Sequence, residues 1–174
     1  MTPAALLLTG TVGIGKTTVA EAVGDMLRDV AVPNAVVDVD WLRAAWPAPP
    51  GDPFNGALAL RNLAAVTANY LDAGVVRLVL AGVLETAEDR AAYAAVLGMP
   101  LVVVRLVADA STVQRRLLRR HAEDDAARSW HLHRAGELHA IQEASGVEHF
   151  VVDTTSRSVV EVAGEVLRVS GWTS

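Results

Sequence analysis

The stretch that decides the fold is Gly10–Thr17, with the sequence GTVGIGKT. It matches the Walker A pattern G-x-x-x-x-G-K-[ST] in full, and in this pattern glycines turn the backbone so that several N–H groups point at phosphate oxygens. A helix that begins near Lys16 adds the partial positive charge of its N-terminus at the same place. The stretch therefore predicts a binding site for a nucleoside triphosphate.

Lys16 is the only lysine among the 174 residues of the chain. An ammonium group is a compact charge on a flexible stem, and a planar guanidinium replaces it poorly against phosphates. We expect Lys16 to reach the β- and γ-phosphates and the hydroxyl of Thr17 to coordinate Mg²⁺. The residues predicted to bind the nucleotide in this loop are Gly10, Gly13, Ile14, Gly15, Lys16, Thr17 and Thr18.

The rest of the chain alternates short apolar runs with helical patterns. The candidate strands are continuous Val, Leu and Ala runs, which are typical of a parallel sheet covered on both faces; they span residues 4–9, 35–39, 77–81, 101–107 and 150–152. Helical patterns occupy residues 16–30, 57–73, 85–97, 111–120, 127–144 and 158–169. We predict one domain over residues 1–174, an α/β fold with a doubly wound five-stranded parallel sheet of the P-loop NTPase type.

The amino-acid composition limits which classes of binding partner we expect. The formal net charge of −5 disfavours a surface that coats nucleic acid. No apolar run approaches the length of a membrane span, which is roughly 18 residues or more. The chain contains no cysteine, which excludes disulfides and thiolate metal sites and fits a cytoplasmic protein. We expect a small-molecule substrate, no nucleic-acid or membrane partner and a cytoplasmic location, with monomer and homodimer both open.

Two carboxylates end the second candidate strand, at Asp38 and Asp40. Ligands of open parallel sheets lie beyond the carboxyl ends of the strands, so both residues are candidates for substrate binding. Two carboxylates in this spacing cannot both enter the core of a buried strand without partners. Aspartate is also a favoured N-cap, so capping of the following helix by either carboxylate stays open. A contact with metal-bound water is a further possibility for Asp38.

Taken together, the Walker A loop, residues 36–47 and the arginine-rich stretch 115–120 resemble small-molecule kinases of the nucleoside-monophosphate-kinase-like P-loop group. This group includes adenylylsulfate, gluconate and shikimate kinases and chloramphenicol phosphotransferase. The resemblance implies an ATP-dependent phosphotransferase that uses Mg²⁺ and acts on a hydroxyl of a small metabolite or antibiotic. Asp40 to Arg43 is similar to the D-x-[ILV]-R segment of these kinases, which implies that Asp40 is the catalytic base and that Arg43 contacts substrate. Val39, Asp40, Leu42 and Pro47 are closest to the antibiotic phosphotransferase pattern.

The resemblance also implies a lid around residues 115–135, whose arginines close on the transferring phosphate. Arg116 and Arg120 share one helical face and are the predicted catalytic arginines, with Arg128 and Arg134 in reserve. The alternative is a solvated face paired with the acidic residues 123–125. By the same resemblance Arg90 is predicted to bind substrate. Thr154 and Arg157 would flank the nucleotide base.

The third candidate strand and the residues after it, 76–85, lack the aspartate that usually ends a Walker B strand. Adenylylsulfate and gluconate kinases are similar in this respect. Without this aspartate, the expected ligands of Mg²⁺ are Thr17, water molecules and Asp38. The guanine-reading N-K-x-D motif requires a second lysine, so we expect ATP as the donor. A nucleotide-dependent regulatory ATPase or switch, and a nucleoside- or polynucleotide-directed kinase, are the alternative functions.

The remaining conspicuous residues are aromatic or imidazole side chains. Trp41 and Trp46 are expected to flank the acceptor site, as its wall or as core residues, and Trp130 is expected to be a packing residue. The proline-rich stretch 46–53 reads as a shaped loop over the site. The five histidines lack the spacing of a helical zinc pair, and His131 or His133 is a candidate for contact with substrate or nucleotide.

Overall fold

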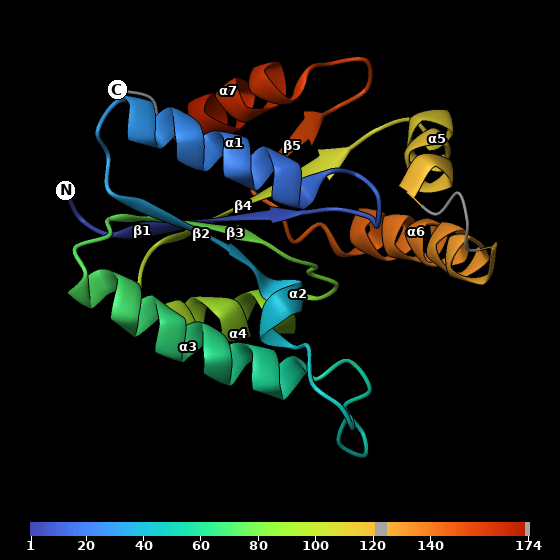
Figure 1. Ribbon diagram of the computed structural model, residues 1–174, viewed down its shortest axis with the longest axis horizontal. Coiled ribbons are helices and arrows are strands. Elements are labelled where there is room, and N and C mark those ends of the chain that lie inside the picture. The colour runs from blue at the N-terminus through green and yellow to red at the C-terminus, as the bar shows by residue number, and fades with distance from the viewer. Residues whose placement is uncertain (121–124, 173–174) are drawn as a thin grey trace.

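Five parallel strands form one sheet in the order β2-β3-β1-β4-β5 (Figure 1). The central strand β1 leads directly into the Walker A loop and pairs with β3 on one side and β4 on the other. The strands span Ala4–Thr9 (β1), Asn34–Asp38 (β2), Arg77–Ala81 (β3), Leu101–Val107 (β4) and Phe150–Asp153 (β5). The predicted doubly wound α/β sheet is therefore confirmed.

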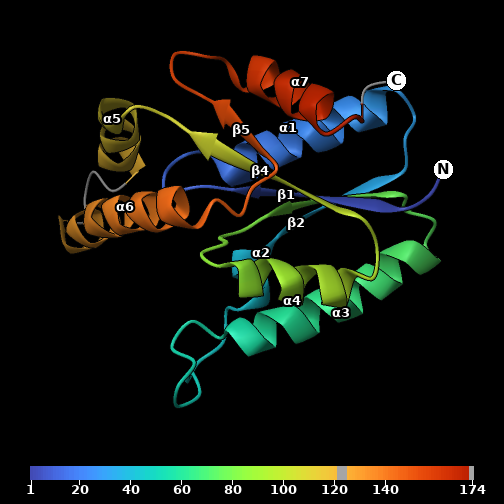
Figure 2. The same cartoon turned by 180° about the vertical axis from the view of Figure 1, so that it is seen from behind.

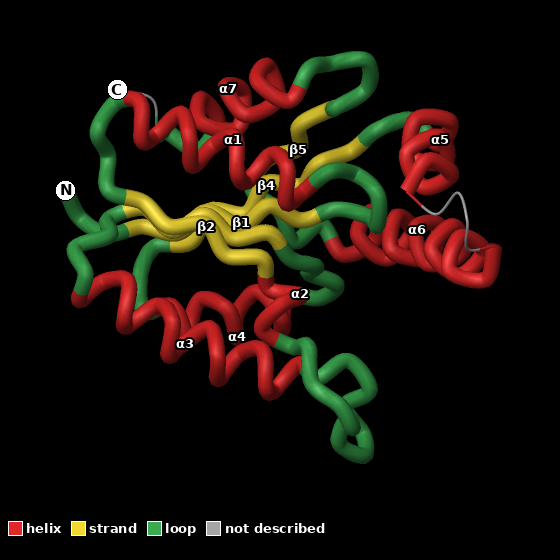
Figure 3. The backbone as a smooth tube through the Cα atoms, viewed as in Figure 1, coloured by secondary structure: helices red, strands yellow, loops and turns green. Residues whose placement is uncertain are grey.

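The structure is a computed structural model that describes residues 1–120 and 125–172, without the side chains of residues 120 and 125–128. Helices α1 (Lys16–Asp29) and α7 (Val159–Val169) cover one face of the sheet, and α3 (Gly56–Asp72) and α4 (Ala87–Leu97) cover the other (Figure 2). Helices α5 (Ala110–Arg120) and α6 (Asp125–Ser145) lie beyond the end where β1 and β4 finish, whereas the short helix α2 (Val39–Leu42) follows β2 on the side of α3 and α4 (Figure 3). The predicted lid falls on α5, on α6 and on residues 121–124, which lie outside the described residues.

The sheet separates two apolar layers. Leu6 and Leu8 of β1 point into the layer beneath α1 and α7, whereas Leu7 points into the layer beneath α3 and α4. All three leucines are fully buried. Because the central strand β1 fills both layers, its sequence is a continuous apolar run rather than an alternating one. No described helix is long and apolar enough to cross a membrane.

The predicted bounds of β1, β3 and β4 are confirmed, and the predicted helices agree within two residues at each end. The prediction for the second strand is wrong at its end: β2 stops at Asp38, and Val39 begins the four-residue helix α2. This helix was not expected, because one turn is too short to carry a hydrophobic period. Helix α4 begins at Ala87 since Thr86 and Asp89 form a capping box, which satisfies the first free N–H groups of the helix.

Two helical glycines test how α1 packs on the sheet. A Cβ atom at Gly24 would lie 2.5 Å from Cγ2 of Val36 on β2, whereas one at Gly164 of α7 would lie 3.9 Å from Cε of Met26. We expect Gly24→Ala to lower the free energy of unfolding by about 1–3 kcal/mol, as overpacking does. Gly164→Ala is the matched control and should raise it by about 0.5–1 kcal/mol. Urea denaturation measures both changes, and a Gly24→Ala variant as stable as wild type would contradict this packing.

Candidate active site

The Walker A loop depends on glycine at two positions. Gly10 and Gly15 have φ angles of 140° and 99°, which residues with a side chain rarely adopt. A Cβ atom on Gly10 would also lie 2.5 Å from the carbonyl oxygen of Leu106 on β4. Glycine therefore lets the loop pass close to β4 and turn into α1 with its N–H groups towards the phosphate side.

Lys16 lies over this loop. Its Nζ donates hydrogen bonds to the carbonyl oxygens of Gly10 and Thr11, both at 3.1 Å. The loop opens into a cavity of about 700 Å³, called here the nucleotide cavity. Most of the predicted nucleotide-binding residues line it, together with both aspartates; the lining includes Gly13, Gly15, Lys16, Thr17, Thr18, Asp38, Asp40, Trp41 and Arg116.

Asp38 connects the loop to the end of β2. The Thr17 hydroxyl donates to Oδ2 of Asp38 at 2.7 Å, and the backbone N–H of Asp40 donates to Oδ1 of Asp38 at 2.9 Å. Asp38 is therefore the N-cap of α2, one of the roles left open above. Its second oxygen faces the residue predicted to bind Mg²⁺. A hydroxyl and a carboxylate oxygen side by side are hard donors that fit Mg²⁺.

Arg116 lines the nucleotide cavity and joins the Walker A loop to the segment after β5. Its Nη1 donates to the carbonyl oxygen of Ile14 at 2.9 Å and to Oγ1 of Thr154 at 3.1 Å, and its Nη2 donates to the carbonyl oxygen of Thr154 at 3.3 Å. Helix α5, which carries part of the predicted lid, is thus tied to both the Walker A loop and the segment after β5. The side chains of Arg120 and Arg128 lie outside the described residues.

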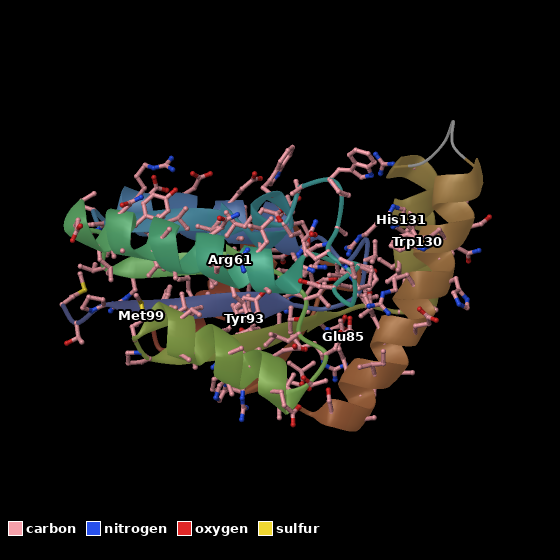
Figure 4. The ribbon with its side chains drawn as sticks, turned by 90° about the horizontal axis from the view of Figure 1, so that it is seen from below. Arg61, Glu85, Tyr93, Met99, Trp130 and His131 are labelled. Atoms are coloured by element: carbon pink, nitrogen blue, oxygen red, sulfur yellow. The ribbon has the colours of Figure 1, made fainter. Side chains whose placement is uncertain are left out.

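A second cavity of about 580 Å³, the acceptor cavity, lies beside the first. Asp40 and Val83 line both cavities. The acceptor cavity has walls from the segment before α3, from the β3–α4 connection, and from α4 and α6. Figure 4 shows Glu85 at the near end of α4 and Trp130 and His131 on α6. The charged and aromatic residues that line the acceptor cavity are Asp40, Arg43, Asp52, Phe54, Glu85, Asp89, Tyr93, Trp130, His131 and Arg134.

The proline-rich segment forms part of this wall, as expected. Asn55 holds it by donating to the carbonyl oxygens of Arg43 and Ala45, both at 2.9 Å. Asp52 accepts the backbone N–H groups of Gly56 at 2.7 Å and Ala57 at 3.0 Å. These two hydrogen bonds lower the pKa of the Asp52 carboxyl group, because they stabilise its charged form. Asp52 therefore stays ionised at the start of α3.

Arg43 lies in the acceptor cavity, where the sequence placed it. Its Nε is 3.7 Å from Oδ1 of Asp40, which is too long for a hydrogen bond. Burial raises the pKa of Tyr93, and the neighbouring Arg43 guanidinium opposes that shift. Although both atoms are buried, neither Arg43 Nε nor the Tyr93 hydroxyl completes a hydrogen bond of normal geometry with the described residues. The Tyr93 hydroxyl and the Arg43 guanidinium therefore interact with each other at the wall of the cavity.

The structure does not bring every predicted residue to the site. Arg90 donates to the carbonyl oxygen of Val147 at 3.0 Å and lines neither cavity, because its position on α4 faces the connection that precedes β5. Arg157 donates to the carbonyl oxygens of Asp153 and Glu161, both at 3.1 Å, and its contact with nucleotide stays a prediction. Trp46 is 93% exposed and lines neither cavity.

Other residues reach the site unexpectedly. Trp130 was expected only to be a packing residue, but it is 53% exposed and lines the acceptor cavity. Glu85 forms an ion pair with Arg134 across this cavity, and Phe54 lies against the same guanidinium. The position of Glu85 after β3, at the carboxyl end of the sheet, was the available signal. His131 lines the cavity, whereas His133 lies 3.1 Å from Glu137 on the exposed side of α6.

The chain was compared with known protein families, curated proteins and solved structures. No model of a known protein family matches the chain, and no curated protein matches it in sequence. Solved structures do match it over nearly its whole length. The tunicamycin resistance protein of Deinococcus radiodurans superposes with a TM-score of 0.70 at 18% identity, covering 99% of this chain and 98% of that one. The chain has the fold of P-loop small-molecule kinases.

Two further kinases share this fold. The APS kinase of Mycobacterium tuberculosis, solved with AMPPNP and APS, has a TM-score of 0.63 at 24% identity, and the match covers 98% of each chain. The shikimate kinase of Acinetobacter baumannii, solved with shikimate, has a TM-score of 0.63 at 18% identity, and the match covers 98% of this chain and 93% of that one. At these identities the likeness concerns the fold.

Lys16 can be tested without knowledge of the acceptor. Because it is the sole lysine, an amine-directed acylating reagent should label this side chain and the N-terminus. Mg-ATP at saturation should protect Lys16 but not the N-terminus, and peptide mass spectrometry measures both. Lys16→Ala should weaken ATP binding. Equal labelling of Lys16 with and without ATP would count against the nucleotide site as described.

Arg116 is tested against a neighbour on the same helix. If its guanidinium stabilises the transferring phosphate, Arg116→Ala should lower kcat by about 10³-fold or more. Arg119→Ala is the control, because Arg119 is exposed on α5. It should leave turnover unchanged and shift stability by about 0.5 kcal/mol or less. A fall in thermal stability of Arg116→Ala with unchanged kcat would instead assign Arg116 to holding Ile14 and Thr154 together.

Proposed function

We propose that this protein is an ATP-dependent kinase that transfers the γ-phosphoryl group to a hydroxyl of a small molecule. The observation that carries the proposal is the position of Asp40, which lines both the nucleotide cavity and the acceptor cavity. A carboxylate at this junction can hold an acceptor hydroxyl next to the phosphate-binding loop. The alternative function, a regulatory ATPase, requires a positioned water molecule but does not require a second cavity of about 580 Å³ for an acceptor.

The residues divide the work by position. The loop N–H groups and Lys16 hold the β- and γ-phosphates. The Asp40 side chain is 65% exposed. Its carboxylate accepts the proton of the acceptor hydroxyl and orients the hydroxyl oxygen towards the phosphorus. Arg116 offers positive charge from the lid side as charge redistributes over the transferring group. Positioning and charge stabilisation supply most of the rate, as in other phosphoryl transfers.

Thr17 and Asp38 would hold Mg²⁺. Their side-chain oxygens lie 2.7 Å apart at the edge of the nucleotide cavity. Oxygen donors of this kind are the ones that Mg²⁺ prefers. When bound, the metal ion neutralises phosphate charge. Asp38 also keeps Asp40 in place through the backbone N–H of Asp40, so its carboxylate serves the nucleotide side and the acceptor side together.

The two aspartates should give different defects. Asp40→Asn keeps the shape of the side chain but removes the basic oxygen, so acceptor-dependent turnover should fall by about 10²–10⁴-fold while ATP affinity stays unchanged. Asp38→Asn should show a defect that shrinks as the Mg²⁺ concentration rises, and the Asp40→Asn defect should not. Steady-state kinetics over a Mg²⁺ series separates the two. Full turnover in Asp40→Asn would mean that another group is the base.

The function itself is tested by a panel of hydroxyl compounds. ADP release should exceed the background without acceptor for at least one compound, and the phosphorylated product should appear in equal amount. The Lys16→Ala variant gives the blank for contaminating kinases. If no acceptor stimulates ADP release while ATP is hydrolysed, the regulatory-ATPase alternative takes the place of this proposal.

A further inference from the structure

The acceptor cavity contains more acidic than basic side chains. Its described lining holds four carboxylates, Asp40, Asp52, Glu85 and Asp89, and two guanidinium groups, Arg43 and Arg134. An acceptor with its own carboxylate or phosphate would need a guanidinium that is available for pairing. The charge balance therefore depends on how the two arginines are engaged.

Arg134 is held by its own partners. Its Nη2 pairs with Glu85, its Nη1 lies 3.4 Å from Oε2 of Glu137, and its guanidinium lies 5.7 Å from the ring centre of Phe54. The Arg134 side chain is 20% exposed and that of Glu85 is 32% exposed. Solvent and salt therefore weaken this pair little. An anion that binds Arg134 must displace Glu85 and then lie beside it.

Arg43 is likewise surrounded by carboxylates. Oδ1 of Asp40 lies 3.7 Å from its Nε, and the Arg43 charge contributes to the lowered pKa of Asp52. An anion brought to Arg43 would meet the Asp40 carboxylate beside it, and like charges at such a distance repel. Neither arginine of the cavity thus provides a site for a negative group.

The uncharged part of the lining favours a ring. Trp130 is 53% exposed at the cavity and Phe54 is 54% exposed. Both rings therefore present area that a planar ligand can cover. Tyr93 is 5% exposed, and its hydroxyl completes no hydrogen bond of normal geometry with the described residues.

We propose that the acceptor cavity selects a ring-bearing alcohol without negative charge, and that Glu85 excludes anionic acceptors by holding Arg134. This inference rests on the proposed function, because it names the substrate class of the same site. It makes Glu85 a residue that determines specificity without taking part in the transfer.

The test uses three alcohols with the same ring and hydroxyl but different charge. They are 4-(hydroxymethyl)benzamide, 4-(hydroxymethyl)benzoate and 4-(aminomethyl)benzyl alcohol, which are neutral, anionic and cationic. Their Kd values are measured by calorimetry or ligand-observed NMR with a non-hydrolysable ATP analogue bound, at about pH 8, above the ordinary pKa of histidine. We expect the benzoate to bind at least about tenfold more weakly than the benzamide.

Variants of the Arg134 partners then locate the cause. Glu85→Gln should release Arg134 and lower the benzoate-to-benzamide Kd ratio by about fivefold or more. Glu137→Gln is the matched control. Glu137 is the other carboxylate beside Arg134, but Glu137 does not line the cavity, so its removal should leave the ratio unchanged. Arg134→Gln leaves Glu85 without its partner and should raise the ratio, which keeps the test decisive if Glu85→Gln fails to fold.

Three outcomes would overturn the inference: tighter binding of the benzoate, an unchanged ratio in the Glu85 and Arg134 variants, or no binding of any of the three alcohols. These outcomes are separate from failure of the proposed function. If an anionic alcohol binds best and is phosphorylated, the kinase proposal stands and the charge selection is wrong. If the benzamide binds as expected but no hydroxyl compound stimulates ADP release, the charge selection stands and the kinase proposal is wrong.

Discussion

The Asp38 carboxylate holds the two halves of the site together. One oxygen accepts from Thr17 at the start of α1 and the other from the backbone N–H of Asp40 at the start of α2. Asp38 is itself fixed because it ends β2 in register with Ala81 of β3. The position after β3 where a Walker B aspartate would usually stand is also next to α2. A Cβ atom on Gly82 would lie 3.3 Å from Cγ2 of Val39, so α2 packs tightly over the residue that follows β3.

Helix α6 carries one wall of the acceptor cavity, and buried polar contacts of residues that do not line that cavity hold it in place. Arg105 of β4 is 5% exposed and pairs with Glu143 of α6 at 2.7 Å and with Glu148 at 3.0 Å. Gln142, also on α6, is 1% exposed and donates to Oγ1 of Thr9 and to the carbonyl oxygen of Leu84. A buried charge must be paired, so these contacts fix the position of the helix. The orientation of Trp130 and Arg134 over the acceptor cavity follows from them.

Local pattern predicted the sheet well because three strands are continuous apolar runs with clear ends, and the Walker A loop locates β1 by itself. Asp38, Asp40 and Arg43 line the two cavities because a parallel sheet brings the ends of its strands together, and their roles stay predictions. Prediction failed where long-range packing decides which way a helical residue faces. Arg90 and Trp130 are both on helices, and nothing near them in the sequence distinguishes a cavity wall from a packed or locally bonded surface. The pairing of Glu85 with Arg134 joins residues far apart in the chain and carries no local signal.

The two cavities differ in how their cations are engaged, and this difference bears on which ligand enters which cavity. In the nucleotide cavity, Arg116 donates to neutral oxygens of Ile14 and Thr154 and pairs with no described carboxylate, so its charge remains available to phosphates. In the acceptor cavity, both guanidinium groups lie against carboxylates. On the proposed function, a triphosphate would therefore be drawn to the Walker A side and repelled from the acceptor side. The same charges that would select an uncharged alcohol would also keep ATP out of the acceptor cavity. Electrostatics as well as shape would therefore place ATP on one side of Asp40 and the alcohol on the other.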